Sequence, residues 1–433
     1  MARPSSAAPP ATARTLAARV VHRVFRDAAY AAAALDAELS RHTELDARDR
    51  ALATELVYGV LRTRGALERH LAPYIARPVS DAMTRVHLLV AAYQLLLLDR
   101  VPAFAAVDAA VSAVRAERGA RLAGFVNAVL RRLAASGERI PLQDALLESG
   151  PEWLIERLTA VVGRDETVAL LGGAGPPELG LRLVAGREPP EWLSRERAGR
   201  VSPRARLVRD LGDPRQRPGY AEGAFVLQEE GAQAVALLLG ARPGERVLDA
   251  CAGRGQKTTL LAELVGPAGV VWASDLSPKK LSRIPAELTR LGLPAVETRA
   301  ENLELGPGAL PDGFDRVLVD APCTGTGTLR HRPEIRGRLG PEDPARLAAV
   351  QARILRTAAT RARPGGRVVY AVCSVLPDEG EGVVERVRDL LEPAPFDAPE
   401  LEGRLSLAGT TALRLLPGAH GTDGYFVASF VKR

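Results

Sequence analysis

Hydrophobic residues in the first third of the chain recur every three or four positions, which is the spacing of one face of an α-helix. Residues 84–98 are apolar on nearly all sides, as expected for the central helix of a bundle. No alternating strand pattern interrupts residues 14–133. We therefore predict a separate all-α domain over residues 13–137. The repeat consists of Leu16, Val20, Val24 and Phe25, then Leu52, Leu56, Val60 and Leu61, then Phe125, Val129, Leu130 and Leu133.

The pattern changes at about residue 222, where short apolar runs begin to alternate with helical segments. Near-continuous apolar strands separated by helices are typical of a parallel sheet covered on both faces. We therefore predict an α/β domain over residues 221–433. Its expected strands lie at residues 246–248, 270–273, 314–319 and 367–372, and its clearest helices at residues 257–264 and 345–360.

The segment between these regions, residues 138–220, is rich in proline and arginine. A helical pattern over residues 151–171 is followed by strand-like pieces at 179–184 and 206–208, which predicts a small mixed α/β connecting domain. Residues 1–12 consist largely of proline, serine and alanine. Such a segment cannot bury enough apolar surface to become ordered, so we expect a disordered tail.

Composition limits the class of protein. Of the 433 residues, 46% are hydrophobic and 25% are charged, which is ordinary for a globular protein and excludes collagen, a disulfide scaffold and wholesale disorder. The longest apolar run, residues 86–98, is shorter than the ~20 residues that span a bilayer. No secretory signal follows Met1. We expect a cytoplasmic enzyme without a membrane partner.

The distribution of charge and of cysteines limits which binding partners and which kinds of site are expected. The net charge of +6 is uneven, because basic residues outnumber acidic ones in residues 1–135 and arginines cluster again at 195–217. Clustered cations favour a polyanionic partner, although arginines on ordinary solvated faces would give the same count. The three cysteines form no C-x-x-C pair, and the six histidines are scattered, so we expect neither a metal site nor a disulfide framework.

Chemically reactive residues gather where the predicted strands end. Parallel sheets bind ligands at the carboxyl ends of their strands, so these residues are expected to meet at one edge. The first strand runs into Asp249 and the loop 251–257, the second ends at Asp275, the third ends in Asp320-Ala-Pro-Cys323, and the fourth ends at Cys373-Ser374.

The loop after the first strand indicates an adenosine-type cofactor. Gly253 and Gly255 permit close backbone approach to a ligand. The loop is neither a Walker A nor a G-x-G-x-x-G sequence, because Cys251 and Thr258 stand where glycines are required. Asp275 can accept hydrogen bonds from both hydroxyls of a ribose, or instead cap the following helix. The absence of a phosphate-binding sequence favours S-adenosylmethionine over NAD or ATP.

The third strand end points to a reaction at a ring carbon. Methylation of an exocyclic amine would favour Asp/Asn-Pro-Pro-aromatic here, whereas this chain has a thiol at Cys323. Carbon 5 of cytosine is a poor nucleophile until a thiolate adds to carbon 6. Asp320 can then protonate or hydrogen-bond ring nitrogen 3 and the amino group. Cys323 and Cys373 are both possible nucleophiles, and a small core residue is the alternative for Cys373.

Several segments carry a family resemblance. Residues 249–258, 320–327 and 370–377 resemble the motifs of the Nol1/Nop2/Sun RNA cytosine-5 methyltransferases, and residues 50–62 and 125–132 resemble the RNA-binding antitermination factor NusB. The fusion of the two is similar to the branch of the family that acts on small-subunit ribosomal RNA. The resemblance implies a NusB-like helical domain at 13–137 and a Rossmann-like class I methyltransferase domain at 221–433. Residues 330–335 and 415–426 also fit.

The same resemblance implies residue roles. Cys373 corresponds to the nucleophile, Cys323 to a second thiol that assists release of the covalent adduct, and Asp320 to the acid that contacts the base beside the cofactor. The implied cofactor-binding residues are Cys251, Ala252, Gly253, Arg254, Gly255, Gln256, Lys257, Asp275, Glu301 and Asp320.

We therefore expect a monomeric enzyme that transfers a methyl group from S-adenosylmethionine to carbon 5 of a specific cytosine. The expected substrate is 16S ribosomal RNA, either naked or at an early stage of assembly. Two alternatives stay open. One is the same chemistry on transfer RNA or another RNA, and the other is a non-enzymatic NusB-like antitermination factor whose methyltransferase fold serves only as a scaffold.

Overall fold

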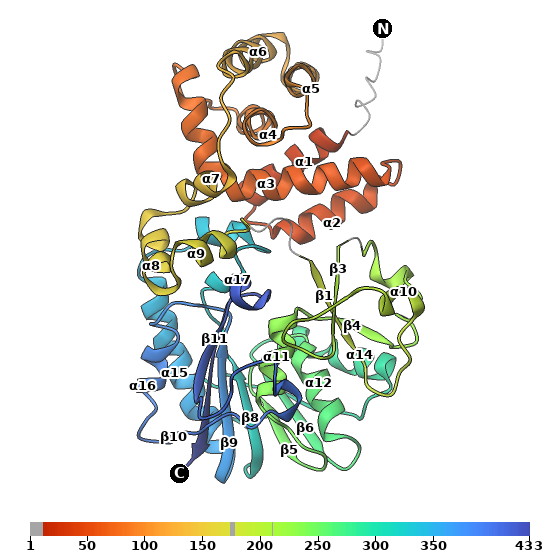
Figure 1. Ribbon diagram of the computed structural model, residues 1–433, viewed down its shortest axis with the longest axis vertical. Helices are drawn as coiled ribbons and strands as arrows, with labels where there is room; N and C mark the ends of the chain where they lie inside the picture. Colours follow the sequence, from red (N-terminus) through yellow and green to blue (C-terminus); the bar gives the residue numbers. More distant parts are fainter. Residues whose placement is uncertain (1–11, 174–177, 210) are drawn as a thin grey trace. The chain divides into compact units, whose positions relative to one another are not determined.

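The computed structural model describes residues 12–173, 178–209 and 211–433 (Figure 1). The chain divides into two compact units. The first comprises Met1–Ile155, Leu171–Gly173 and His331–Arg338, and the second comprises the remaining residues. Apart from Thr12, the predicted disordered tail lies outside the described residues. No helix in the described ranges is both long enough and apolar enough to cross a membrane.

The first unit is a helical bundle, as the three- and four-residue spacing predicts. Helix α4 is buried on almost all sides, which confirms the predicted central helix. Polar caps mark several helix starts: the side chains of Thr12, Asp46 and Asp81 accept hydrogen bonds from the first turns of α1, α3 and α4. The helices are α1 (Ala13–Arg26), α2 (Ala31–Arg41), α3 (Ala47–Leu71), the 3-10 turn η1 (Ala72–Tyr74), α4 (Ala82–Leu97), α5 (Ala103–Arg118), α6 (Ala120–Ala135) and α7 (Leu142–Glu148).

Helix α3 is kinked at Thr63, and a distant segment of the same unit fills the kink. Thr63 has φ −115° and ψ 15°. A kink frees backbone carbonyls that need other hydrogen-bond donors. The short 3-10 helix η4 (Pro333–Gly337) supplies them, because the buried guanidinium of Arg336 donates to the carbonyls of Leu61 and Arg62 in α3 and to that of Leu146 in α7. Burial and nearby Arg62 lower the Arg336 pKa to about 10, which leaves it charged at neutral pH.

Replacing Arg336 with Ala is therefore expected to destabilise the helical unit by about 3 kcal/mol, because buried carbonyls would lose charged donors. Urea unfolding followed by circular dichroism at a helix-sensitive wavelength measures this loss. Arg338→Ala is the matched control: Arg338 is exposed and donates to the single carbonyl of Ala29. An equal loss in the two variants would contradict the special role of Arg336.

The second unit contains a small antiparallel sheet in the order β2-β3-β1-β4. Strands β1 and β3 confirm the strand-like pieces predicted near residues 179 and 206. The single helix predicted over residues 151–171 is wrong, because Gly163 adopts a left-handed φ of +82° and divides it into α8 and α9. The elements of this part of the chain are α8 (Glu152–Val162), whose residues up to Ile155 belong to the first unit, α9 (Arg164–Leu170), β1 (Leu179–Leu183), α10 (Glu191–Ser194), β2 (Arg197–Ala198), β3 (Ala205–Val208), η2 (Pro214–Gln216) and β4 (Phe225–Leu227).

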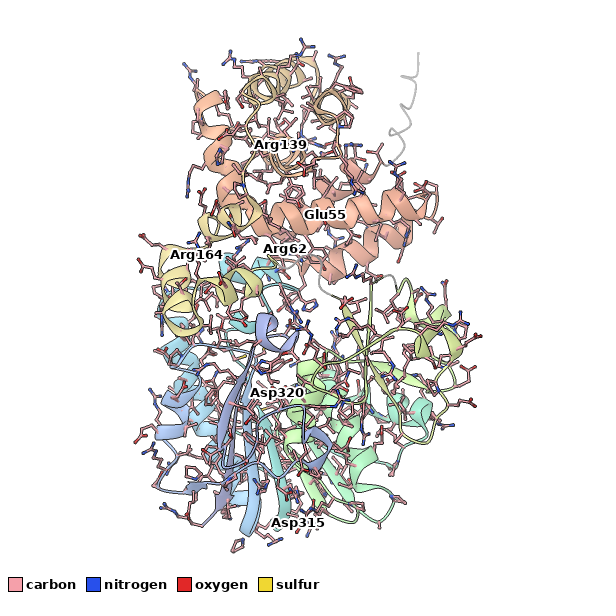
Figure 2. The ribbon with its side chains drawn as sticks, viewed as in Figure 1. Glu55, Arg62, Arg139, Arg164, Asp315 and Asp320 are labelled. Atoms are coloured by element: carbon pink, nitrogen blue, oxygen red, sulfur yellow. The ribbon has the colours of Figure 1, made fainter. Side chains whose placement is uncertain are left out.

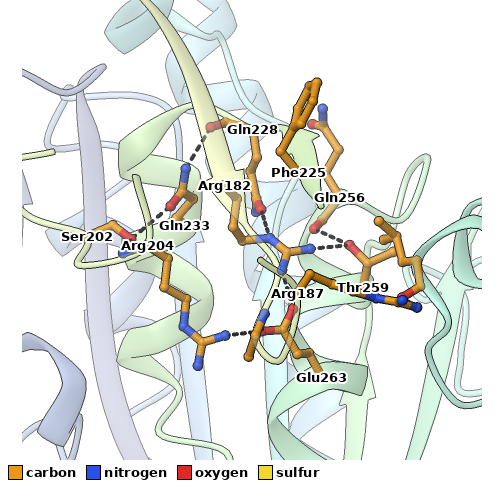
Figure 3. Close-up of polar contacts among 12 residues, drawn as sticks. Arg182, Arg187, Ser202, Arg204, Phe225, Gln228, Gln233, Gln256, Thr259 and Glu263 are labelled. Carbon is orange, nitrogen blue, oxygen red and sulfur yellow. Dashed lines mark hydrogen bonds and ion pairs between the residues drawn. The ribbon is translucent and has the colours of Figure 1, made fainter. Parts of the chain in front are cut away.

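A buried polar network joins this small sheet to helix α12 (Gln256–Val265) (Figure 3). The side chain of Arg182, on β1, is fully buried. Its guanidinium donates to Gln228 Oε1 at 2.8 Å and Thr259 Oγ1 at 3.1 Å, and pairs with Glu263 Oε2 at 2.5 Å. Arg204 also pairs with Glu263. Because Thr259 and Glu263 lie on α12, the network fixes this helix against β1.

The main sheet has the order β10-β12-β9-β8-β5-β6-β7, with β11 paired to β12. Strands β7, β6, β5, β8 and β9 are parallel, which confirms the predicted parallel sheet. Strand β12 was not predicted, and it runs antiparallel to β9. The strands are β5 (Arg246–Asp249), β6 (Val270–Asp275), β7 (Glu297–Ala300), β8 (Phe314–Asp320), β9 (Ala362–Val372), β10 (Leu391–Pro393), β11 (Ala412–Leu415) and β12 (Tyr425–Lys432).

Helices cover both faces of the main sheet, so the domain has the predicted Rossmann-like fold (Figure 1). Neighbouring strand residues alternate between the faces: Val247 packs with α11 and α12, whereas Leu248 packs with α15. The helical elements are α11 (Glu230–Leu238), α12, α13 (Pro278–Leu281) and α14 (Ile284–Leu291), then η3 (Thr326–Thr328), α15 (Asp343–Arg361), α16 (Glu381–Glu385), η5 (Pro399–Leu401) and α17 (Pro417–His420).

Candidate active site

The strand register brings the chemically reactive residues to one edge of the main sheet. Asp249 is paired with Ala273 and Leu318, near the ends of β6 and β8, and Asp320 is paired with Ala371, near the end of β9. Figure 2 shows Asp320 and Asp315 at opposite ends of β8. The strand order reverses between β5 and β8 at this edge, and such a switch point is the usual ligand site of open parallel sheets.

The two thiols that follow β8 and β9 lie close together. Cys323 Sγ and Cys373 Sγ are 3.2 Å apart, and both cysteines are free and partly buried. Backbone hydrogen bonds fix the two loops against each other, because the N–H of Ala321 donates to the carbonyl of Ala371 and that of Gly327 donates to the carbonyl of Cys373. The two loops therefore hold both sulfur atoms close together where β8 and β9 end.

Lys257 adds a cation to this edge. Its Nζ lies 2.6 Å from Asp320 Oδ2 and 5.8 Å from the centre of the Tyr425 ring. Burial opposes the positive charge, but attraction to Asp320 outweighs it and raises the Lys257 pKa. The ion pair therefore keeps the Lys257 ammonium charged near Cys373.

The loop before α12 is shaped by glycine. Gly255 has φ +87°, and a Cβ there would come within 2.7 Å of Ile284. The N–H of Gly253 donates to Asp275 Oδ2 at 2.9 Å, while Asp275 Oδ1 accepts from the N–H of Ser277 at 2.8 Å. Asp275 therefore fastens the loop to the end of β6 and also caps the next turn.

A pocket of about 160 Å³ opens beside this loop. Two of the residues predicted to bind a cofactor, Gly255 and Asp275, are not among the residues that line this pocket. They shape the loop beside it. Glu301 directly follows β7, where its carboxylate accepts a hydrogen bond from the N–H of Ala309. The lining residues are Asp249, Cys251, Ala252, Gly253, Arg254, Gln256, Lys257 and Asp320.

Comparison with known proteins identifies the family. Residues 236–431 match the family model described as 16S rRNA methyltransferase RsmB/F, and residues 11–135 match the NusB family. The chain is 33% identical to the probable ribosomal RNA small subunit methyltransferase B of Synechocystis sp., over 97% of this chain and 99% of that protein. The chain belongs to the RsmB/F family of 16S rRNA methyltransferases. Within this family it carries the NusB domain as well.

Other relatives agree with this assignment. The ribosomal RNA small subunit methyltransferase B of Salmonella paratyphi A is 33% identical, with 89% of this chain and 91% of that protein covered. The solved structure of PH0851 is similar in fold, with a TM-score of 0.78 at 23% identity, and covers 97% of this chain and 99% of that one. A methyltransferase homologue from Pyrococcus horikoshii matches with a TM-score of 0.55 at 27% identity, covering 67% and 98%.

As a member of this methyltransferase family, the protein uses S-adenosylmethionine. The pocket suits the positively charged methionine portion of this cofactor. Asp249 Oδ2 accepts from Thr258 Oγ1 at 2.7 Å, but its buried Oδ1 has no hydrogen-bond partner among the described residues. Burial, reinforced by the charge of Asp320, raises the Asp249 pKa to about 7. An unpaired carboxylate oxygen in the pocket wall fits the ammonium group of the cofactor's methionine portion. When bound, the cofactor supplies an electrophilic methyl group.

The raised pKa predicts that cofactor affinity depends on pH. Only the ionised form of Asp249 attracts a cation, and this form becomes dominant as the pH rises through about 7. From about pH 6 to about pH 7.5 we expect the dissociation constant of S-adenosylmethionine, measured by calorimetry, to fall about five- to tenfold. In Asp249→Asn the dependence should flatten. A slope that persists in Asp249→Asn would assign the effect to another group.

Cys251 is unsuited to nucleophilic chemistry. Burial, together with the carboxylates of Asp249, Asp320 and Asp275, raises the pKa of its thiol far above neutral pH. It lines the pocket as a neutral side chain.

Two residues at this edge, Glu229 and Glu379, carried no recognisable signal in the sequence, whereas Arg330 and Asp423 lie within the segments 330–335 and 415–426 that fit the family resemblance. The Arg330 guanidinium contacts Asp423 Oδ1 at 2.6 Å, and the N–H of Asp423 donates to Glu229 at 2.9 Å. Burial and the charge of Asp423 raise the Glu229 pKa. Glu379 lies beneath the two cysteine loops. Glu229 and Glu379 belong to no motif or periodic pattern in the sequence, so only their positions in space identify them.

Several arginines of the cluster at 195–217 are ion-paired. They pair with nearby carboxylates, which removes part of the positive potential that the sequence predicted for this segment. The pairs are Arg195 with Glu191, Arg197 and Arg209 with Glu178, Arg204 with Glu263 and Glu400, and Arg215 with Asp213.

Proposed function

We propose that the protein transfers a methyl group from S-adenosylmethionine to carbon 5 of a specific cytosine in 16S rRNA through a covalent cysteine–cytosine intermediate. The observation that carries this proposal is the 3.2 Å separation of the Cys323 and Cys373 sulfurs at the edge that holds Lys257 and Asp320. Methyl transfer to a nitrogen would need no thiol. Transfer to carbon 5 needs one, because the ring must first be activated by addition at carbon 6.

The electrostatics support Cys373 as the nucleophile. The hydrogen bond with Cys373, together with burial, raises the Cys323 pKa well above its usual value, so Cys323 keeps its proton. The ammonium of Lys257 interacts with the charge of Cys373, so it can stabilise negative charge that develops on this sulfur. In this assignment the Cys323 thiol assists release of the product after methyl transfer.

Asp320 and Lys257 have complementary roles. When Cys373 adds to carbon 6, electron density moves to ring nitrogen 3 and carbon 5. Asp320 is proposed to accept a hydrogen bond from the exocyclic amine and, in its protonated form, to give its proton to nitrogen 3, which neutralises this density, while Lys257 holds the Asp320 side chain in place. After methyl transfer, water accepts the carbon 5 proton, the C5–C6 double bond re-forms as the Cys373 thiolate leaves, and the proton on nitrogen 3 returns to Asp320.

The remaining predicted residues and domains fit the same scheme. We place the methionine end of the cofactor along residues 251–257, its ribose hydroxyls at Asp275 and its adenine near Glu301. The helical domain 13–137 and the connecting domain 138–220 would hold the RNA through its phosphates, leaving the catalytic domain 221–433 to receive a base that has left its stack. A monomer acting in the cytoplasm on naked or early-assembly rRNA remains our expectation.

Bisulfite sequencing of RNA from a strain lacking the gene, with and without the restored gene, tests this proposal. One cytosine of 16S rRNA should lose its methylation and regain it on complementation. Unchanged 16S rRNA with a lost signal in transfer RNA or another RNA would assign the same chemistry to a different substrate. Unchanged RNA together with no heat of S-adenosylmethionine binding would instead favour a non-enzymatic RNA-binding factor.

A further inference from the structure

A buried carboxylate lies beneath the two cysteine loops. Glu379 is fully buried. Its Oε1 accepts hydrogen bonds from the Thr324 N–H and from Gln351 Nε2, both at 2.9 Å. Its Oε2 accepts from the hydroxyls of Ser374 at 2.6 Å and Thr324 at 2.5 Å. Four donors converge on one side chain, so its charge is fully satisfied without a cation.

Two of the donor residues come directly after the two cysteines in the sequence. Thr324 directly follows Cys323, and Ser374 directly follows Cys373. The residue after each thiol is therefore hydrogen-bonded to the same carboxylate. A further hydrogen bond joins the two cysteine loops, because the hydroxyls of Thr326 and Ser374 lie 2.9 Å apart. The separation of the two sulfur atoms thus depends on the position of the Glu379 carboxylate.

Glu379 is itself rigidly held. The hydroxyl of Tyr370, near the C-terminal end of β9, lies 2.6 Å from the backbone carbonyl of Glu379 and 3.0 Å from Gln351 Oε1. Gln351, on α15, also donates to the carbonyl of Pro322, next to Cys323. The sheet and the covering helix therefore fix the carboxylate, and the carboxylate fixes the loops.

We infer that Glu379 is a positioning residue that holds the thiols of Cys323 and Cys373 at the separation needed for one to add to the base and the other to assist its release. This inference rests on the proposed cytosine-5 reaction. Glu379 does not touch the reacting atoms and acts through the residues that follow the two thiols. Its negative charge also faces Cys323, which helps that thiol to retain its proton.

The kinetic test compares Glu379→Ala with Glu379→Gln. Glu379→Ala removes all four acceptor contacts, and we expect kcat to fall about 100-fold, as for a misplacement of about 1 Å at a reacting group, with KM for RNA and for S-adenosylmethionine unchanged. In Glu379→Gln the amide oxygen can accept from Thr324 N–H and Gln351, and the rotatable hydroxyls can accept from the amide nitrogen. This variant should recover at least about tenfold of the loss. A rise in KM with unchanged kcat would overturn the inference.

A second test measures thiol geometry without RNA. Phenylarsine oxide binds two adjacent thiols together, forming two As–S bonds and releasing one water. The wild type and Glu379→Gln should bind it tightly, whereas Glu379→Ala and Cys323→Ser should bind it at least about tenfold more weakly. Equal binding by Glu379→Ala and the wild type would overturn the positioning role. Tight wild-type binding without any methylation of cytosine would instead count against the proposed function alone.

Glu381→Gln is the matched control, because Glu381 lies two positions further on, is exposed and pairs with Arg414. It should leave kcat and arsenical binding unchanged. If Glu379→Ala does not fold, Thr324→Val and Ser374→Ala replace it, since each removes one hydroxyl donor to the carboxylate. Each is expected to lower kcat about tenfold at unchanged KM. Wild-type kcat in both variants would refute the inference.

Discussion

Replacement of Cys373 by Ala is expected to abolish methylation and the covalent adduct together, whereas replacement of Cys323 by Ala is expected to leave the protein attached to its RNA. Without the Cys373 thiolate, nothing adds to carbon 6, so we expect turnover to fall by more than about 10⁴-fold. Without Cys323, addition and methyl transfer proceed but release is slow. Transfer of labelled methyl groups measures the first effect, and a slow band on a denaturing gel measures the second.

The double variant Cys323→Ala/Cys373→Ala provides the control, because it lacks the thiol needed for attachment. It should give no slow band. If Cys373→Ala traps the RNA while Cys323→Ala shows no adduct, the two roles are reversed. If neither single variant loses methylation, the covalent mechanism is wrong, even though the two sulfurs lie 3.2 Å apart.

Asp320→Asn is expected to lower kcat by about 10³-fold, within the range for loss of a positioned acid–base group. The substitution removes the charge that pairs with Lys257 at 2.6 Å and weakens the contact proposed for the base. Single-turnover methylation at saturating RNA and S-adenosylmethionine separates this chemical defect from weaker binding. The Asp249 carboxylate and its unpaired oxygen remain in the variant, so the cofactor should still bind.

Asp315→Asn is the matched control on the same strand. Asp315 lies at the opposite end of β8, where its carboxylate accepts from the N–H of Arg246 and pairs with Arg363 (Figure 2). We expect a kcat within about threefold of the wild type, because this end of the strand is far from the chemistry. Equal losses at Asp315 and Asp320 would indicate a general effect on β8 and would contradict a catalytic role for Asp320.

Much of the fold follows from periodicity in the sequence. The three- and four-residue spacing predicts the helices of the first unit, including the all-round apolar α4, because a helix must bury its apolar face. The four apolar runs predict β5, β6, β8 and β9. Since parallel strands end at one edge, the sequence also predicts that Asp249, Asp275 and Asp320 come near one another.

The sequence by itself therefore determined which segments are buried and which reactive groups follow the strands, because both depend on local order along the chain. Only the tertiary structure decided the partners. It placed Arg336 in the kink of α3, paired β12 with β9, paired Arg197 with Glu178 and set Glu379 beneath both thiols. Hydrophobic spacing records how deeply a residue is buried. Hydrogen bonds and ion pairs between distant residues depend instead on distances and directions in space, which a linear pattern does not contain.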